Sequence, residues 1–346
     1  MNLDLQEHTH RRLNPLTGEW ILVSPHRAKR PWQGKREPSP PSGRPRYDAN
    51  CYLCPGNTRA SGEINPEYDG TFVFTNDFAA LLPDTPLGGD QNDELMTAVA
   101  DRGACRVVCF SPFHDVSMAR LGEDSIGDVV SRWVEEYRRL SDLEYIGHIQ
   151  IFENKGAIMG CSNPHPHGQI WANEIPPTMP GIESEKQQSY MERHGRCMLC
   201  DYLDRELREG ARIVAETDEF VVLVPFWAVW PFETMILPRN HRSSISEFSA
   251  NERHDLAAAI RLICAKYDNL FETEFPYSMG IHQAGTTADR SGVWHSHLHY
   301  FPPLLRSATV KKFMVGYELL GMPQRDITAE VSAERLRSQP GTHYLG

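Results

Sequence analysis

Residues 163–171 read Asn-Pro-His-Pro-His-Gly-Gln-Ile-Trp, and residues 295–301 read His-Ser-His-Leu-His-Tyr-Phe. Both segments place histidines at every second position, and alternate residues of an extended strand share one face. His165, His167 and Gln169 would therefore lie on one face of a strand. Because this pattern occurs twice in the chain, we expect the fold to contain two related units.

The segments that precede these two strands also follow the same order. Each begins with a Cys-x-x-Cys pair and continues through an apolar run to a loop that ends in a histidine. A helix follows, with apolar residues at helical spacing over 126–140 in one unit and over 256–270 in the other. The chain therefore resembles an internal duplication of an α+β unit, and we expect domains at residues 1–180 and 181–346.

Composition excludes several classes of function. The chain has 346 residues, with 35 Lys and Arg against 46 Asp and Glu, and a net charge of −11. Such an acidic balance argues against nucleic acid as a partner. The longest apolar stretch, residues 220–232, contains two prolines and is too short to span a membrane. The first twelve residues contain no apolar signal segment, so a cytoplasmic location is expected.

One segment differs in composition from the rest. Residues 26–46 contain seven Lys or Arg and five Pro, which is typical of an extended basic arm. The arm is either a solvated loop or a segment that reaches a phosphate or a partner subunit.

The Cys-x-x-Cys pairs predict metal sites. Eight cysteines in this chain are too few for a disulfide scaffold, and two thiolates with two imidazoles complete a zinc tetrahedron. The alternative is a reduced cysteine pair beside unrelated histidines. The first predicted zinc set is Cys51, Cys54, His114 and His165. Its counterpart in the repeat, which predicts a second zinc, is Cys197, Cys200, His241 and His295.

The strand that follows the first zinc set predicts the chemistry. If His165 binds zinc, then His167 lies beside a fixed centre, and a neutral imidazole can attack phosphorus as a nucleophile. The preceding residues 155–162 offer glycines, backbone amides and the Ser162 hydroxyl, which together can cradle a phosphate. Gln169 could then hydrogen-bond the phosphoryl oxygens. The alternative is that these histidines serve only as metal ligands.

At this point the sequence shows a family resemblance. Residues 163–171 resemble the active-site signature of the galactose-1-phosphate uridylyltransferase family, a transferase branch of the histidine-triad superfamily. The resemblance covers nearly the whole chain, and the other matching segments are 14–18, 27–32, 74–80, 152–156, 231–234 and 303–318. It implies an α+β fold of duplicated histidine-triad-like units, with a mostly antiparallel sheet and helices packed on it.

The resemblance also implies a reaction. His167 would take uridylyl from UDP-glucose and release glucose 1-phosphate, then pass UMP to galactose 1-phosphate to give UDP-galactose. Ser162 would contact the β-phosphoryl group. Gln169, in place of the third histidine of hydrolysing relatives, would favour transfer over hydrolysis. The alternatives are a nucleotidyltransferase of the ADP-glucose phosphorylase type, a hydrolase, and a zinc-stabilised binding module without catalysis.

Further residues follow from the resemblance by position. The nucleotide would contact Ala60, Asn76, Asp77, Asn154 and Cys161, the last expected to pack as a small residue rather than to react. The hexose phosphate would contact Lys312, Val315, Tyr317, Glu318 and Gln324. Arg27 and Arg30 would enter the site from the other subunit of a homodimer.

The repeat and the resemblance disagree about the second metal. The resemblance implies a metal of the iron type on Glu183, His282, His297 and His299, whereas the repeat implies zinc on the second Cys–His set. We favour the Cys–His set because thiolates bind zinc strongly, while both sites could coexist. About two metal ions per chain are expected.

Overall fold

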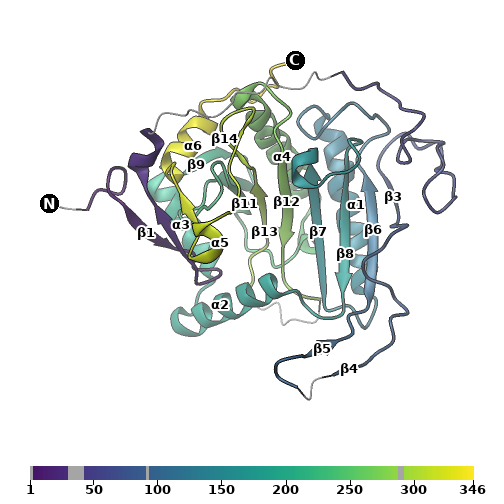
Figure 1. Cartoon of the computed structure of the whole chain (residues 1–346), viewed down its shortest axis with the longest axis horizontal. Coiled ribbons are helices and arrows are strands. Elements are labelled where there is room, and N and C mark those ends of the chain that lie inside the picture. Colours follow the sequence, from purple (N-terminus) through teal and green to yellow (C-terminus); the bar gives the residue numbers. More distant parts are fainter. Residues whose placement is uncertain (1–2, 30–42, 91–92, 287–291) are drawn as a thin grey trace.

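A nine-stranded sheet runs through the middle of the molecule (Figure 1). The computed structural model describes residues 3–29, 43–90, 93–286 and 292–346. All neighbouring strands of this sheet pair antiparallel. In spatial order the strands are β3 (Phe72–Thr75), β6 (Gly103–Cys109), β8 (His167–Asn173), β7 (His148–Lys155), β12 (Tyr277–His282), β13 (His297–Phe301), β11 (Thr234–Pro238), β10 (Phe220–Leu223) and β9 (Ile213–Glu216).

The strand order confirms the duplication. β7 and β12 pair at the centre of the sheet, with Ile281 opposite Ile151. Outward from β7 lie β8, β6 and β3, and outward from β12 lie β13, β11 and β10, so the two halves repeat one order about the central pair. The expected α+β fold with a mostly antiparallel sheet is therefore confirmed. The domain limits 1–180 and 181–346 stay a prediction.

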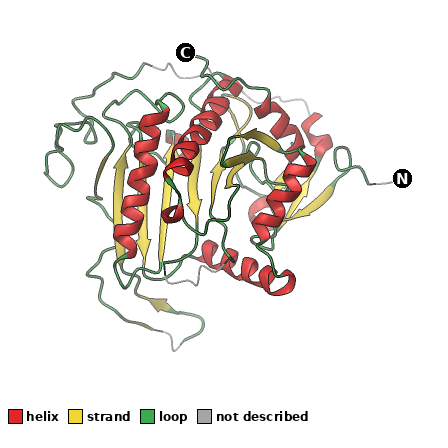
Figure 2. Ribbon diagram, turned by 180° about the vertical axis from the view of Figure 1, so that it is seen from behind, coloured by secondary structure: helices red, strands yellow, loops and turns green. Residues whose placement is uncertain are grey.

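Two helices cover one face of the sheet. Figure 2 shows α1 (Glu123–Ser141) and α4 (Ala250–Phe271) lying across it. Both were expected from helical spacing, and the side chain of Ser249 caps α4 in a reciprocal bond with Glu252. Their apolar sides bury Trp133 and Ile260 against the sheet. None of the helices in the described ranges has both the length and the apolar character needed to cross a bilayer.

The other face of the sheet carries the polar side chains. Along β7, Ile149 and Ile151 are buried in the core beneath the helices, whereas the alternate residues Phe152 and Asn154 line a cavity. Ile170 of β8 likewise points into the core. His167 and Gln169 therefore share the cavity face, as the alternation in the sequence predicts.

The remaining elements surround this framework. A three-stranded sheet holds β1 (His10–Leu13), β2 (Trp20–Val23) and β16 (Gln324–Arg325). Helix α2 (Thr178–His194) crosses one end of the large sheet and leads to α3 (Met198–Glu209) (Figure 1). The others are η1 (Pro25–Lys29), β4 (Gly89–Asp90), β5 (Ala98–Val99), η2 (Ala157–Met159), η3 (Ile245–Glu247), β14 (Leu304–Ser307), β15 (Val310–Lys311), α5 (Tyr317–Leu320) and α6 (Ala329–Arg337).

A buried ion network attaches the N-terminal strands to the second half. The Arg12 guanidinium, which is 1% exposed, donates to both carboxylate oxygens of Glu330 at 2.9 and 3.0 Å. Arg212 donates to the same carboxylate at 2.9 Å and also pairs with Glu206. Burial alone would raise the pKa of Glu330, but the two guanidinium groups outweigh it and lower the pKa to about 2.

We expect Glu330→Gln to lower the free energy of unfolding by about 3 kcal/mol at pH 7, because it removes the charge partner of the buried Arg12 guanidinium and one of the charge partners of Arg212. The folded-state pKa of Glu330 lies below its ordinary value of 4.5. Its contribution is therefore complete above pH 4.5 and is lost as the pH falls toward 2. Urea unfolding at several pH values measures both effects.

Glu334→Gln on the same helix is the control, since Glu334 is 69% exposed and, among the described residues, its ion pair is with Arg337 in its own helix. It should change stability by less than about 0.5 kcal/mol. Equal stability of the Glu330→Gln variant and the wild type at pH 7 would contradict the anchoring role.

Candidate active site and metal sites

The first predicted zinc set forms one buried cluster. Each of Cys51, Cys54, His114 and His165 is at most 5% exposed, and their ligand atoms lie within 4.8 Å of one another. We call these four residues the first Cys–His cluster. The Cys54 sulfur lies 3.7 Å from Nδ1 of His114 and 3.5 Å from Nδ1 of His165. Two sulfurs and two imidazole nitrogens in this arrangement are the donor set of a structural zinc site.

The surroundings of His165 fix which ring nitrogen faces the cluster. Its Nε2 lies 2.9 Å from the carbonyl oxygen of Ser111, which can only accept a hydrogen bond, so Nε2 carries the proton. Nδ1 is then the lone-pair nitrogen and points to Cys54. Burial lowers the pKa of His165 to about 4, which keeps the ring neutral. The cluster therefore presents His165 in the form that a metal requires.

His167 follows at the start of β8. Its Nδ1 lies 2.7 Å from the carbonyl oxygen of His165, so Nδ1 donates and the lone pair is on Nε2. Burial lowers the pKa of His167 below its ordinary value, and the bond to His165 opposes this only in part. The ring is therefore neutral near pH 7, with Nε2 available as a nucleophile.

A cavity lies over His167. It is lined by Phe152, Asn154, Gly160, Cys161, Ser162, His167, Gly168 and Gln169. The structure thus brings together four predicted site residues of the 154–162 segment and β8: Asn154, Ser162, His167 and Gln169. Cys161 also lines the cavity, but its thiol donates to the carbonyl of Asn163 at 3.0 Å and burial raises its pKa. The thiol is therefore protonated and held in place, in agreement with a packing role.

The side-chain amide of Gln169 has a fixed orientation. The indole Nε1 of Trp171, which can only donate, lies 2.9 Å from Oε1 of Gln169, and Nδ2 of Asn76 lies 3.4 Å from the same oxygen. Both donors require the oxygen at that position. The amide NH₂ group of Gln169 is left to donate toward the cavity that Gln169 lines.

Gly168 allows β8 to approach its neighbours. A Cβ atom at this position would lie 2.8 Å from Cζ of Phe110 and 2.9 Å from the carbonyl oxygen of Phe152. Both distances are shorter than side chains tolerate in a packed core. The glycine between His167 and Gln169 therefore allows β8 to pack closely against Phe110 and β7. This packing fixes how far the side chains of His167 and Gln169 reach into the cavity.

Lys155, the first residue of the expected phosphate cradle 155–162, turns away from the cavity. The ammonium group of Lys155 lies 2.8 Å from Oδ1 of Asp268, and both side chains are buried. Lys155 therefore contributes no charge to the cavity. Instead it anchors the end of β7 to α4, directly before Gly156, which has a φ of +90° and turns the chain toward Ser162.

The predicted nucleotide residues Ala60, Asn76 and Asp77 lie together beside this cavity. Asn76 contacts Gln169, as described above, and Asp77 accepts a hydrogen bond from the backbone amide of Ser61, the residue after Ala60. Asn154, on the other side, accepts a bond at 2.6 Å from the hydroxyl of Ser278. These contacts leave the loop around Ala60 next to the end of β3.

The predicted hexose-phosphate residues form a separate group in the second half. Lys312 pairs with Glu318 at 3.2 Å and donates to the carbonyl of Gln324, while Val315 and Tyr317 are exposed. Arg27 joins this group, because Arg27 and Gln324 both donate to Asp326, at 3.0 and 2.7 Å. None of the described residues of this group lines the cavity at His167. Arg30 lies outside the described residues.

The repeat-derived set forms a second Cys–His cluster, made of Cys197, Cys200, His241 and His295. The Cys200 sulfur lies 3.4 Å from Nδ1 of His241 and 3.2 Å from Nδ1 of His295. Nε2 of His295 donates to the carbonyl of Pro238 at 3.0 Å, as Nε2 of His165 does to Ser111. The two clusters therefore have the same donor atoms, and His165 and His295 have the same tautomer.

The four residues that the family resemblance implies as ligands of an iron-type metal also lie close together in the structure. We call Glu183, His282, His297 and His299 the Glu–His cluster; their ligand atoms also lie within 4.8 Å of one another. Nδ1 of His282 lies 2.9 Å from the carboxylate of Glu183, whereas Nε2 of His297 and Nδ1 of His299 are buried without a hydrogen-bond partner among the described residues. Buried unpartnered nitrogens that converge on a carboxylate fit a metal ion.

Several residues that orient these groups were not predicted from the sequence. Trp171 could have been found, because it shares the strand face of Gln169 two residues away. The carbonyl groups of Ser111 and Pro238 left no signal, since any residue carries a carbonyl. Asp268 was missed because it lies 113 residues from Lys155 in the sequence.

Comparisons with known proteins agree with this architecture. The model of the galactose-1-phosphate uridyl transferase N-terminal domain matches residues 1–177, and that of the C-terminal domain matches residues 183–346. A galactose-1-phosphate uridylyltransferase of Haemophilus influenzae is 52% identical over 98% of this chain and 96% of its own length. The Rattus norvegicus protein of the same name is 51% identical over 98% of this chain and 89% of its own length.

Solved structures resemble the chain over nearly its whole length. A structure described as a uridylyltransferase has a TM-score of 0.76 at 27% identity and covers 96% of this chain and 98% of its own. An ADP-glucose phosphorylase of Arabidopsis thaliana with bound ADP-glucose has a TM-score of 0.74 at 24% identity, covering 96% and 100%. At that identity the second likeness concerns the fold.

We expect Gly168→Ala to lower the free energy of unfolding by about 1–3 kcal/mol, because the added methyl group forces β8 away from Phe110 and β7. Gly127→Ala is the control: it lies in α1, and a Cβ there would meet nothing within 4 Å. That variant should gain up to about 1 kcal/mol from helix propensity. Urea unfolding measures the free energy of unfolding of both variants. A Gly168→Ala variant as stable as the wild type would show that a methyl group fits at this position without displacing β8.

Proposed function

Because this chain belongs to the galactose-1-phosphate uridyl transferase family, we propose that His167 carries the uridylyl group during the reaction. The enzyme transfers uridylyl from UDP-glucose to galactose 1-phosphate and gives UDP-galactose and glucose 1-phosphate. The observation that supports His167 as the carrier is its neutral ring, whose Nδ1 proton is held by the carbonyl of His165 and whose Nε2 lies at the cavity.

In the first step, Nε2 of His167 forms a bond to the α-phosphorus of UDP-glucose. The bond from that phosphorus to the bridging oxygen breaks, and its electron pair leaves with glucose 1-phosphate. The leaving oxygen belongs to a phosphate, so it needs no proton from an acid. The positive charge that develops on the ring is stabilised by the Nδ1 hydrogen bond to the carbonyl of His165.

In the second step, a phosphate oxygen of galactose 1-phosphate attacks the same phosphorus and His167 leaves. Because the first sugar phosphate departs before the second binds, both can use one pocket in turn. This double displacement regenerates neutral His167 and consumes no proton.

Gln169 supports transfer through its fixed amide. With Oε1 held by Trp171 and Asn76, the NH₂ group donates toward the phosphoryl oxygens at the cavity. An amide forms hydrogen bonds but does not ionise near pH 7. Gln169 would therefore stabilise charge without removing a proton from water. Ser162 is placed at the rim of the same cavity, where its hydroxyl can contact the β-phosphoryl group.

The nucleotide part is assigned to the loop and strand ends beside the cavity. Asn76 and Asp77 would hold the uridine and its ribose, with Ala60 near the base and Asn154 on the opposite side. The clustering of these residues around Gln169 supports the assignment. Cys161 completes the wall as a protonated, packed thiol.

The first Cys–His cluster fits zinc, with Cys51, Cys54, His114 and His165 as ligands. When bound, zinc supplies a rigid tetrahedral anchor rather than a reactant. This anchor would keep the His165 carbonyl in place beneath Nδ1 of His167. The second Cys–His cluster also has the donor set of zinc, and the Glu–His cluster offers the nitrogen and oxygen donors that suit iron or zinc.

A homodimer would complete the active site. The cavity residues come from the first half of the chain, while the group around Lys312, Gln324 and Arg27 lies apart from them on the second half. In a dimer, the Lys312 group of one subunit would cover the His167 cavity of the other and bring the basic arm with it. We place this reaction in the cytoplasm, as expected from the sequence.

The alternative function, of the ADP-glucose phosphorylase type, has less support. The Arabidopsis thaliana protein shares the fold at 24% identity. The relatives near 50% identity are galactose-1-phosphate uridylyltransferases.

Incubation with UDP-glucose alone should add the mass of one uridylyl group to the intact protein. Peptide mapping should place this mass on His167, because its Nε2 is the nucleophile. His167→Ala should gain no mass and lose exchange by at least about 10³-fold. His254→Ala, at an exposed position on α4, is the control and should behave as the wild type. A His167→Ala variant with near-normal exchange would refute the mechanism.

Mixed dimers test the shared site. His167→Ala subunits and Lys312→Ala subunits should each be inactive alone, since each lacks one part of every site. Random pairing of equal amounts should restore about a quarter of wild-type exchange, because half of the dimers then hold one complete site of two. Exchange that stays at background in verified mixed dimers would place Lys312 and His167 in the same subunit's site.

A further inference from the structure

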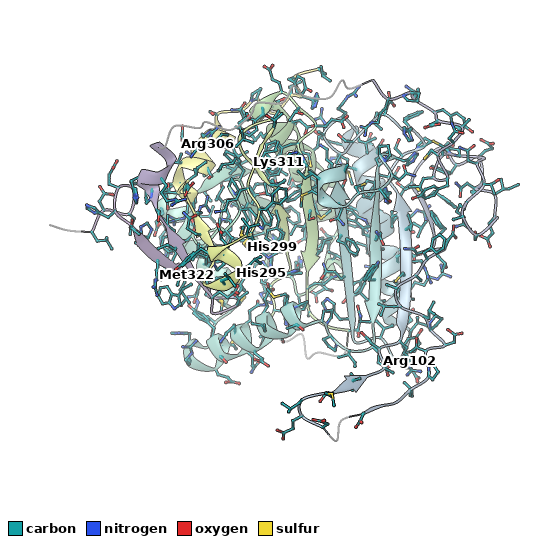
Figure 3. The ribbon with its side chains drawn as sticks, viewed as in Figure 1. Arg102, His295, His299, Arg306, Lys311 and Met322 are labelled. Atoms are coloured by element: carbon teal, nitrogen blue, oxygen red, sulfur yellow. The ribbon has the colours of Figure 1, made fainter. Side chains whose placement is uncertain are left out.

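The second half of the chain contains two metal-ligand clusters that share no residue. The second Cys–His cluster uses Cys197, Cys200, His241 and His295, and the Glu–His cluster uses Glu183, His282, His297 and His299. His295 directly precedes the Ser296–His297 step into β13 and His299 lies within that strand, and Figure 3 labels both side chains in the same part of the molecule. We propose that both clusters hold an ion at the same time, and that the ion of the second Cys–His cluster organises the Glu–His cluster.

The first link between the clusters is a backbone carbonyl. Nδ1 of His297 lies 2.9 Å from the carbonyl oxygen of His295, which is a ligand of the second Cys–His cluster. The carbonyl can only accept, so the proton is on Nδ1 and the lone pair of His297 is on Nε2. Nε2 lies 3.6 Å from the carboxylate of Glu183. An ion that fixes His295 therefore fixes the orientation of a ligand in the neighbouring cluster.

The second link is helix α2. Gln187 accepts a hydrogen bond from the backbone amide of His295 at 3.3 Å, and it lies one helical turn after Glu183. Trp294 donates to the hydroxyl of Ser184 on the same helix at 3.1 Å. Cys197 lies three residues after the end of α2 and is the N-cap residue of α3. The second Cys–His cluster thus contacts the helix that supplies Glu183 and leads into the strand that supplies His297 and His299.

The first half of the chain contains the same hydrogen bond between the two histidines of a His-x-His pair, but the second ring faces different surroundings. There the carbonyl of His165 accepts from Nδ1 of His167 at 2.7 Å, and the free Nε2 of His167 lies at the cavity. In the second half the equivalent nitrogen, Nε2 of His297, is completely buried and faces Glu183. The repeat therefore orients one ring for attack on phosphorus and the other for metal binding.

The charges allow both ions. Two thiolates balance a divalent ion in the second Cys–His cluster. The Glu–His cluster has one carboxylate and three histidines, and imidazoles bind a metal ion in their neutral form. Without an ion, Nε2 of His297 and Nδ1 of His299 stay buried without a hydrogen-bond partner in the described part of the chain.

Elemental analysis of the purified full-length chain tests the proposal without reference to activity. We expect about three ions per chain, one in each cluster, against the two expected from the sequence. His299→Ala should lose one ion and keep the ion of the second Cys–His cluster, because its two thiolates and two imidazoles are intact. A wild-type content of two, with either cluster of the second half empty, would overturn the proposal.

The coupling is tested with variants that keep every Glu–His ligand. The double variant Cys197→Ser, Cys200→Ser should lose its own ion, and a chelator should remove the Glu–His ion about 10–100-fold more readily than from the wild type. Gln187→Met should weaken the Glu–His ion in the same direction while it keeps all eight ligands, which covers the case in which the double variant does not fold.

Gln188→Met is the matched control, since Gln188 is an exposed neighbour whose side chain, within the described part of the chain, donates to Glu192 on its own helix. It should release all ions at the wild-type rate. If both the double cysteine variant and Gln187→Met hold the Glu–His ion as tightly as the wild type, the two clusters are independent and the coupling is refuted. Failure of His167 to carry uridylyl would leave these results unaffected.

Discussion

A hydrogen bond joins the first Cys–His cluster to the ring that we propose as the nucleophile. The carbonyl of His165 accepts the Nδ1 proton of His167, and the same residue faces Cys54 with its own Nδ1. This bond selects the tautomer of His167 and leaves its lone pair on Nε2, and in the proposed mechanism it offsets the charge that forms during transfer. Gly168 then lets β8 pack closely enough that Gln169 reaches the same cavity, where Trp171 holds its amide.

The two halves of the duplicated fold use the same local framework but place the second histidine in different surroundings. In both halves a Cys–His cluster holds the first histidine of a His-x-His pair, and the carbonyl of that histidine orients the second. What differs is the environment of the second ring. Around His167 the segment 156–162 leaves a cavity, whereas α2 places the carboxylate of Glu183 against His297. The same local geometry therefore leaves one ring facing a cavity, as the proposed nucleophile requires, and the other ring facing a carboxylate, as a metal ligand requires.

Much of this could be read from the sequence, because the informative residues recur in a fixed order. The Cys-x-x-Cys pairs and the His-x-His strands predicted both Cys–His clusters and the common face of His167 and Gln169, and the family resemblance implied the mostly antiparallel sheet. Lys155 shows the limit. A lysine in a Gly-containing loop resembles a phosphate ligand, but its partner Asp268 comes from a distant helix that no local pattern reveals. Likewise, the sequence favoured one of the two candidate sets for a second metal and left their coexistence open, because only the three-dimensional structure shows that the two sets form separate clusters.

The central pair of strands has a mechanical consequence. Residues 151–155 of β7 are hydrogen-bonded in register to residues 277–281 of β12, so the two halves share one unbroken sheet. A hinge between them would have to break this ladder, and the molecule cannot open and close like a two-lobed clamp. Sugar phosphates must therefore enter and leave a static framework, past short segments at its rim such as 156–162. The rigid sheet thus positions the phosphorus precisely, while small local motions of these segments control the entry and release of the sugar phosphates.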